Sequence, residues 1–230
     1  MRKGAVLLFR DGLCYQSYGW NLLRPLGDIQ NAVNHLDSYN VDEIAIIRPV
    51  RKDDTKSSFL ADIEELKRLK SSSPLSFGGG IRDFQSLSYL QGLPFERYLF
   101  SSALYYEDSS IIQQAIQLFG QQAVVGFLPF RYDLVASFFN SQKGIFLPSK
   151  MINRESFKSC DEVVLYDCES EGKKSGFHLE VLRELDIDIS KCVLSGGISD
   201  DFERLNTLDK RPSGILIENS VLHSEFSIKR

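Results

Sequence analysis

The chain has 230 residues, 43% of them hydrophobic and 25% charged, with a formal net charge of −4 at pH 7. This length and composition suit one large domain or two small ones with a sizeable core. The mild acidity argues against a nucleic-acid or anionic-membrane partner, and no apolar run approaches the ~18 residues needed to span a bilayer.

The four cysteines, Cys14, Cys160, Cys168 and Cys192, form no CxxC motif and no His-supported metal spacing. We therefore expect free thiols in a cytoplasmic protein, with no metal and no other cofactor.

Apolar runs of strand length alternate with segments of helical period along the whole chain. Strands are expected at 5–9, 43–47, 75–77, 98–100, 123–127, 162–166, 192–194 and 214–217. Helices are expected at 29–36, 59–69, 84–90, 110–119, 154–158, 179–185, 202–208 and 219–222. Asp28 is the expected cap of the first helix, and Ser109 or Ser110 that of the fourth. Residues 10–27 are expected to form a polar loop, and 134–139 with 144–147 a small extra hairpin inside an irregular segment, 128–160.

Eight strands alternating with helices favour a single (βα)8 barrel over residues 1–230, with a truncated last helix. An open doubly wound sheet is the alternative, but it normally carries its glycine-rich turn after the first strand.

Two glycine motifs follow the third and seventh expected strands: Phe77-Gly78-Gly79-Gly80-Ile81 and Ser195-Gly196-Gly197-Ile198. Glycines at a strand end let the backbone approach a ligand closely, and the next helix offers free N–H groups to an anion. Ser102 lies as far beyond Gly80 as Asn219 lies beyond Gly197. The repeat predicts two phosphate sites, and hence a ligand with a phosphate at each end.

Five stretches, FGGGIRDFQSL, SGGISDDFERL, LLFRDG, GDIQNAV and NSVLH, resemble the cyclase subunit of imidazole glycerol phosphate synthase (HisF) and its isomerase sister. The resemblance covers nearly the whole chain, and 128–160 and the C-terminus diverge. It implies phosphate-binding residues Gly79, Gly80, Ser101, Ser102, Gly196, Gly197, Asn219 and Ser220. A purely structural role of these residues in tight turns is the alternative.

The positions that the resemblance assigns to the two catalytic aspartates read Leu8 at the first strand and Leu128 or Pro129 at the fifth. None of these side chains can transfer a proton. Asp11 and Glu169 are the candidate replacements, although Asp11 fits a turn residue better. Arg48 stands where the family usually has a carboxylate. The sequence therefore leaves enzymatic activity open.

The resemblance also implies a ring of alternating charges at the opposite end of the barrel, formed here by Arg2, Glu43, Arg97 and Glu162, with Glu96 beside it. In the family such a ring surrounds the entry of ammonia from a docked glutaminase. A purely structural ion network is the alternative.

Leu8 before an Arg-Asp-Gly turn is similar to divergent HisF-like proteins of surface-polysaccharide and other glycan pathways. This likeness implies a barrel that pairs with a glutamine amidotransferase (HisH-type) subunit, binds a phosphorylated sugar or phosphoribosyl ligand and helps to amidate a sugar. A conventional cyclase or isomerase of histidine biosynthesis and a non-catalytic scaffold are the alternatives.

Overall fold

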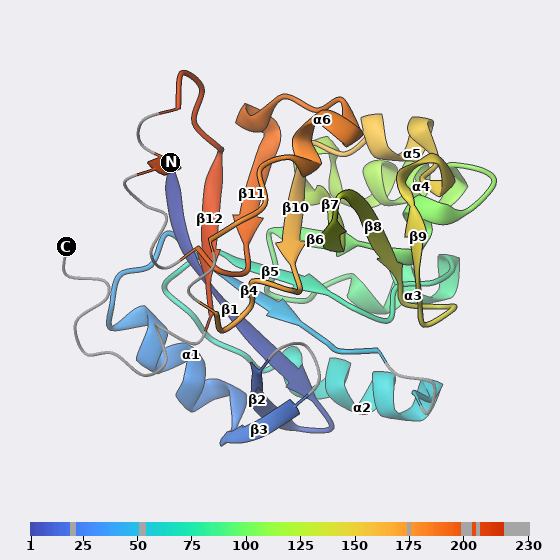
Figure 1. Ribbon diagram of the computed structural model, residues 1–230. Helices are drawn as coiled ribbons and strands as arrows, with labels where there is room; N and C mark the ends of the chain where they lie inside the picture. Colours follow the sequence, from blue (N-terminus) through green and yellow to red (C-terminus); the bar gives the residue numbers. More distant parts are fainter. Residues whose placement is uncertain (19–21, 51–53, 174–175, 199–203, 206–207, 219–230) are drawn as a thin grey trace.

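The computed structural model describes residues 1–18, 22–50, 54–173, 176–198, 204–205 and 208–218 (Figure 1). Eight parallel strands form its centre: β1 (Arg2–Arg10), β4 (Glu43–Ile47), β5 (Leu75–Gly78), β6 (Arg97–Phe100), β7 (Val124–Asp133), β10 (Glu162–Asp167), β11 (Cys192–Ser195) and β12 (Gly214–Ile217). Strand pairing runs from β10 through β11, β12, β1, β4, β5 and β6 to β7, and β7 pairs with β10. The sheet is therefore closed, which confirms the (βα)8 barrel and excludes the open doubly wound sheet.

Helices and 3-10 turns connect the strands on the outside of the barrel (Figure 1): α1 (Ile29–Asp37), α2 (Lys56–Leu66), α3 (Phe84–Leu90), η1 (Ser102–Tyr105), α4 (Ser110–Phe119), η2 (Gln121–Ala123), η3 (Ser149–Met151), α5 (Arg154–Lys158), α6 (Val181–Leu185) and η4 (Ile189–Lys191). The expected helix at 202–208 falls largely, and the truncated helix at 219–222 wholly, outside the described residues.

Side-chain caps set where the helices begin. Asp28 accepts a hydrogen bond from the Asn31 N–H, as predicted. Thr55 caps α2 in the same way, so this helix begins three residues before the apolar residue from which it was predicted. Ser109 is the N-cap residue of α4, as expected, but its side chain makes no capping hydrogen bond. The carboxylate of Asp108 accepts from the Ser110 N–H instead. The carboxylate is the better acceptor because its charge also favours the helix N-terminus.

The expected polar loop at 10–27 is wrong, because the segment contains a hairpin of β2 (Leu13–Tyr18) and β3 (Leu22–Gly27). β2 continues antiparallel from β1 through the two-residue turn Asp11-Gly12, whose φ angles are +51° and +76°. Two positive φ angles define the turn that the Asp-Gly pair favours between strands. The pair was interpreted as a turn but not as a hairpin.

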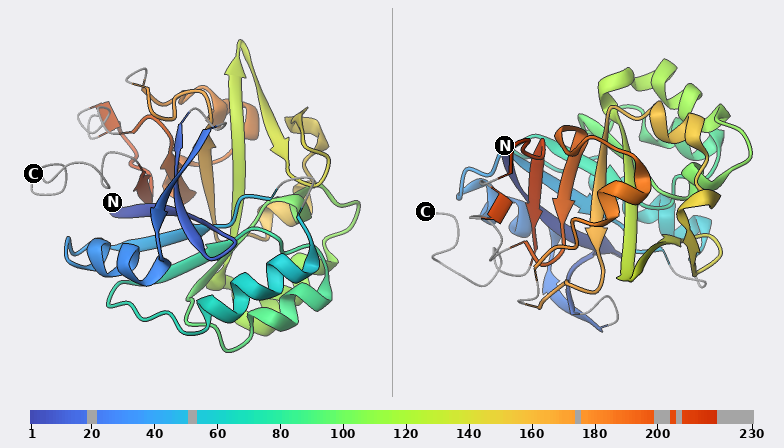
Figure 2. Two further views of the ribbon diagram at one scale, coloured as in Figure 1. Left: turned by 90° about the horizontal axis from the view of Figure 1, so that it is seen from below. Right: turned by 45° about the horizontal axis from the view of Figure 1, so that its top comes forward.

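The second hairpin matches the prediction, but the barrel strand that precedes it, β7, was predicted too short. β7 runs on to Asp133 and pairs antiparallel with β8 (Val135–Asn140), which pairs with β9 (Ile145–Pro148). Figure 2 shows the β2–β3 hairpin in blue and the β7–β8 hairpin in yellow-green extending from the barrel. Both hairpins follow the carboxyl ends of parallel strands, where barrel sites are found.

The buried apolar side chains form two clusters, which differ in whether helices contribute to them. The larger cluster joins strands to helices. The smaller one contains no helix residue and includes Val6, Ala45, Leu99, Val125, Val164, Val193 and Leu216, one from each of seven strands. Because side chains alternate along a strand, this smaller cluster is the barrel interior. No helix in the described ranges is long and apolar enough to cross a membrane.

Candidate functional site

A pocket of about 680 Å³ lies at the carboxyl ends of the barrel strands. Leu8, Ile47, Leu99, Phe127 and Pro129 line it from four strands of the barrel. This barrel mouth is predominantly apolar, which suits the body of a ligand better than its charged groups.

Residues of the two hairpins also line this pocket. β2 supplies Ser17, β3 supplies Leu23 and β8 supplies Phe139. Phe139 packs on Phe146 of β9 with ring centroids 5.2 Å apart, and Phe146 also packs against the interior cluster. The divergent segment therefore builds part of the site, a role that its irregular sequence did not indicate.

The structure distinguishes the two candidates for the second substituted aspartate. Pro129 lines the mouth, whereas Leu128 is fully buried in the outer cluster between strands and helices. Leu8 faces the mouth as expected. The two side chains at the positions that the resemblance assigns to proton transfer are thus Leu8 and Pro129, and neither carries a titratable group.

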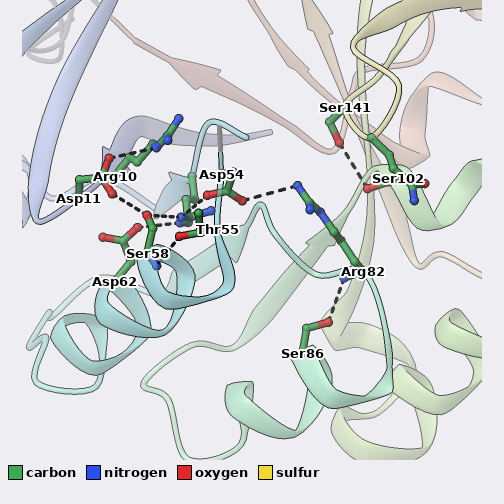
Figure 3. Close-up of polar contacts among 12 residues, drawn as sticks. Arg10, Asp11, Asp54, Thr55, Ser58, Asp62, Arg82, Ser86, Ser102 and Ser141 are labelled. Atoms are coloured by element: carbon green, nitrogen blue, oxygen red, sulfur yellow. Dashed lines mark hydrogen bonds and ion pairs between the residues drawn. The ribbon is translucent and has the colours of Figure 1, made fainter. Parts of the chain in front are cut away.

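The two candidate replacement carboxylates do not line the mouth. Asp11 occupies the hairpin turn, where it pairs with Arg10 at 3.1 Å and accepts a hydrogen bond from the Ser58 hydroxyl at 2.5 Å (Figure 3). Glu169 lies in the loop after β10, and its N–H donates to Asp167. The pocket lining contains neither residue.

Arg48 forms a buried ion cluster behind the mouth. Its Nε donates to Asp62 at 2.6 Å, and its Nη2 donates to Asp54 at 2.5 Å and to Ser58 at 2.9 Å. Asp62 also accepts from the Gly12 N–H, and Asp54 approaches Arg82 at 3.5 Å (Figure 3). Burial works against the charged guanidinium, but its hydrogen bonds to Asp54 and Asp62 outweigh this and raise the pKa of Arg48.

This cluster shows how the barrel accommodates an arginine that is only 1% exposed. A buried charge is tolerated when opposite charges and hydrogen bonds surround it. Because Ile47 faces the mouth, Arg48 points outward toward α2, where Asp62 lies. The substitution at the end of the second strand is therefore matched by a buried acid on the following helix.

The first glycine turn has the conformation that its sequence predicts. Gly79 and Gly80 have φ angles of +111° and +89°. A Cβ on Gly79 would lie 2.1 Å from the Arg48 carbonyl oxygen, and one on Gly80 would lie 2.7 Å from the Phe59 ring. A side chain at either position would disturb the fold itself, so substitution there cannot isolate an effect on phosphate.

The serines assigned to the first phosphate site lie close by. Ser101 lines the mouth, and its hydroxyl oxygen is buried without a hydrogen-bond partner in the described part of the chain. The Ser102 hydroxyl lies 3.3 Å from that of Ser141, in the turn between β8 and β9 (Figure 3).

The second glycine turn packs against the loop after β10. Gly196 and Gly197 have φ angles of +87° and +69°. A Cβ on Gly196 would lie 2.3 Å from the Asp167 carbonyl oxygen, and one on Gly197 would lie 2.5 Å from the Ser170 Cβ. Asn219 and Ser220, the remaining members of this site, lie outside the described residues.

Replacing Gly196 with alanine is expected to lower the free energy of unfolding by about 1–3 kcal/mol more than replacing Gly92. Both residues have positive φ, which alanine adopts at a cost, but a Cβ on Gly92 would meet nothing within 4 Å. Urea unfolding of the two variants measures the difference. Equal losses would show that the turn relaxes around the added methyl group.

A pair of carboxyl groups beside the mouth, those of Glu171 and Glu218, was not predicted from the sequence. Glu171, 1% exposed, lies in the loop after β10, and Glu218 follows β12 directly. Glu171 and Tyr166 both adjoin the Glu218 carboxyl group, and Tyr166 lines the pocket. Burial first, and then the neighbouring Glu171, raises the pKa of Glu218 well above its ordinary value. The sequence feature that could have indicated this pair is Glu218, an acidic residue directly after the apolar run of the last strand.

A second acidic group in this region organises a loop. Asp167 is fully buried and accepts hydrogen bonds from the N–H groups of Glu169, Ser170 and His178. It also contacts the His178 ring nitrogen Nδ1 at 2.7 Å. Because Tyr166 faces the mouth, Asp167 faces outward. The contact between Asp167 and His178 therefore stabilises the loop after β10, and neither residue lines the mouth.

At the opposite end of the barrel, the four charges of the predicted ring lie together. Each is the first residue of its strand. Arg2 contacts both carboxylate oxygens of Glu162, at 3.0 Å and 2.5 Å, and its Nε lies 3.7 Å from Glu43. Arg97 also donates to Glu162. Burial opposes the charge of Glu162, but both arginines outweigh it and lower its pKa.

Glu96 lies beside this ring. Its carboxylate accepts the Leu75 N–H at 2.6 Å, and it lines a surface hollow of about 580 Å³ with Ser71, Ser73 and Phe95. Within the described ranges, no group of three or more His, Cys, Asp or Glu residues is arranged to hold a metal ion.

The geometry defines a class of protein: a (βα)8 barrel with glycine turns after β5 and β11, a pocket at the carboxyl ends of the strands and a ring of paired charges at their amino ends. Comparison with known sequences agrees. The profile of the family described as "Histidine biosynthesis protein" matches residues 22–227. The chain belongs to this family.

The relatives that match the chain at low sequence identity carry the names of two kinds of protein, a synthase subunit and an isomerase. An imidazole glycerol phosphate synthase subunit HisF from an Exiguobacterium species is 25% identical over 93% of this chain and 84% of its own length. A putative HisF2 subunit from Campylobacter jejuni is 24% identical over 87% and 82%. An imidazole-carboxamide isomerase from Gloeothece citriformis is 26% identical over 81% and 69%. The matches therefore include both HisF-named subunits and an isomerase.

Proposed function

We propose that this chain is a HisF-like barrel subunit that receives ammonia from a glutamine amidotransferase subunit of the HisH type. The ammonia enters through the charge ring and reacts at the mouth, in the amidation of a surface-polysaccharide or other glycan sugar. The observation that carries the proposal is the contrast between the two ends: four paired charges at the amino ends of the strands, and an apolar mouth at the carboxyl ends.

The ring supports docking because its charges pair across three strands. Glu162 of β10 binds Arg2 of β1 and Arg97 of β6, so the side chains span the barrel opening. The interior cluster above them is apolar, which lets neutral ammonia pass more readily than ammonium. Glu96 and the neighbouring hollow lie at the same end and extend the surface that a partner would cover.

The mouth supports a ligand different from that of a conventional cyclase. Leu8 and Pro129 stand where aspartates would act, and the pocket around them is apolar. A phosphate of the ligand would lie at the first glycine turn, near the Ser101 hydroxyl that has no partner in the described part of the chain. The second phosphate site includes residues outside the described ranges and rests on the resemblance.

Mixing the purified chain with the HisH-type glutaminase of the same organism tests the proposal. We expect a stable complex in size-exclusion chromatography and faster glutamine hydrolysis. Arg97→Glu should weaken the complex at least about tenfold, because it places a like charge beside Glu162. Lys143→Glu, an exposed residue of the β8–β9 turn at the other end, is the matched control and should bind normally.

Absence of both a complex and glutaminase stimulation would contradict the proposal. A complex without stimulation would favour the non-catalytic scaffold. The second candidate, a cyclase or isomerase of histidine biosynthesis, is favoured by the names of the relatives. Turnover of the phosphoribosyl substrate, with free ammonia for the cyclase, would establish it and displace the amidation proposal.

A further inference from the structure

The carboxyl pair of Glu171 and Glu218 lies on the inner side of the barrel. Leu216 of β12 belongs to the interior cluster, and the alternation of side chains places Glu218, two residues later, on the same side. Tyr166, which adjoins the Glu218 carboxyl group, lines the mouth pocket and contacts Phe127 with ring centroids 6.0 Å apart. The pair therefore lies where the apolar interior meets the mouth.

The two carboxyl groups adjoin each other, and they can form a hydrogen bond only with a proton on one of them, because ionised carboxylates only accept. Two like charges in a buried site also favour retention of one proton. Among the described residues, Cys168 adjoins this pair, and Asp167 and Arg131 are the other charged groups that act on Cys168. Asp167 faces His178 instead, and the Arg131 guanidinium lies 4.4 Å from the Phe146 ring centroid.

A second observation points to a missing donor. The Oε1 atom of Glu218 is buried and accepts no hydrogen bond from any described residue. Buried acceptor oxygens in native proteins nearly always have a donor, which can belong to a bound ion or ligand. The site thus combines carboxylate and phenol acceptors with a buried oxygen that lacks a partner.

We propose that Glu171, Glu218 and Tyr166 form a binding site for ammonium at the top of the barrel. Ammonium carries one positive charge and four N–H donors, so it can replace the shared proton without changing the net charge of the site. The two carboxylates and the tyrosine oxygen accept its hydrogen bonds. As the destination of ammonia, this site rests on the proposed function.

The exchange balances in protons and charge. Neutral ammonia arriving through the apolar interior takes the shared proton, giving ammonium and two carboxylates. Ammonium then returns one proton to the carboxyl pair and leaves the site as neutral ammonia, whose lone pair is available to the ligand at the mouth. The pair is then restored, and no net charge crosses the interior.

Isothermal titration of the barrel alone with ammonium chloride tests this site without a glutaminase. In two buffers of different ionisation enthalpy at neutral pH, each bound ammonium ion should release about one proton. Glu218→Gln and Glu171→Gln keep the side-chain shape but remove a carboxylate, and should bind at least about tenfold more weakly. Glu180→Gln, an exposed residue at the start of α6, should match the parent.

Three results would overturn the site: no ammonium binding by the parent, equal binding by Glu218→Gln, or equal binding and proton release with potassium chloride. Tyr166→Phe removes one acceptor without touching the carboxyl groups and should weaken binding moderately. It supplies a second variant if a glutamine variant fails to fold. Failed ammonium binding with intact glutaminase docking would reject this site and leave the proposed function standing.

Discussion

Replacing Asp62 with alanine is expected to lower the free energy of unfolding by about 3–5 kcal/mol. Asp62 is 1% exposed and holds the buried Arg48 guanidinium at 2.6 Å. Without it, the guanidinium keeps Asp54 and Ser58 but loses its charged partner on α2, and the Gly12 N–H of the hairpin turn loses its acceptor. Urea unfolding monitored by circular dichroism measures the loss.

Glu64→Ala provides the matched control on the same helix. Glu64 pairs with Lys67 on the surface, and the two side chains are 63% and 42% exposed. An exposed pair of this kind contributes at most about 0.5 kcal/mol. Adding Arg48→Met to Asp62→Ala should recover part of the stability by removing the uncompensated charge. A loss below about 1 kcal/mol for Asp62→Ala would show that water solvates Arg48 in its place.

The stability of the parent chain should fall as the pH rises above the ordinary carboxyl range, and Glu218→Gln should remove much of this fall. Burial and the neighbouring Glu171 raise the pKa of Glu218, so the folded chain holds a proton that the unfolded chain releases. Since the folded state then binds more protons, stability is greatest below the unfolded pKa and is lost with rising pH up to the folded pKa. One such proton gives a slope of about 1.4 kcal/mol per pH unit.

Urea unfolding between about pH 5 and about pH 8 measures this slope. Glu43 also has a raised pKa, caused by burial, and contributes in the same direction. The comparison therefore uses the difference between parent and Glu218→Gln, in which the contribution of Glu43 cancels. Glu180→Gln should follow the parent curve. Parallel curves for parent and Glu218→Gln would contradict a shared proton at the mouth.

The regular parts of the barrel could be predicted from the sequence because each depends on local rules. The strands Glu43–Ile47 and Gly214–Ile217 and the helix Phe84–Leu90 begin and end where their patterns indicate. Arg2 and Glu162, two members of the charge ring that the resemblance implies, also pair. Both residues begin strands, and a closed parallel barrel brings the starts of all its strands to one end.

The hairpins and the carboxyl pair depended on contacts between distant segments. The first hairpin was missed because Leu13–Tyr18 has little strand pattern of its own and is held by its pairing with β1. Glu171 and Glu218 lie far apart in sequence and meet only because β10, β11 and β12 are neighbours in the closed sheet.

By itself, the sequence determined the alternation of strands and helices and the two glycine turns, while its resemblance to the HisF family implied the charges at the amino ends of the strands. The first two follow from residue periodicity and the freedom of glycine to adopt positive φ. Only the tertiary structure decided that Pro129 rather than Leu128 faces the mouth, that Asp62 neutralises Arg48, and that two glutamates share a buried site beside the pocket. Each of these depends on which side chains face each other across the barrel, and closure of the sheet sets this.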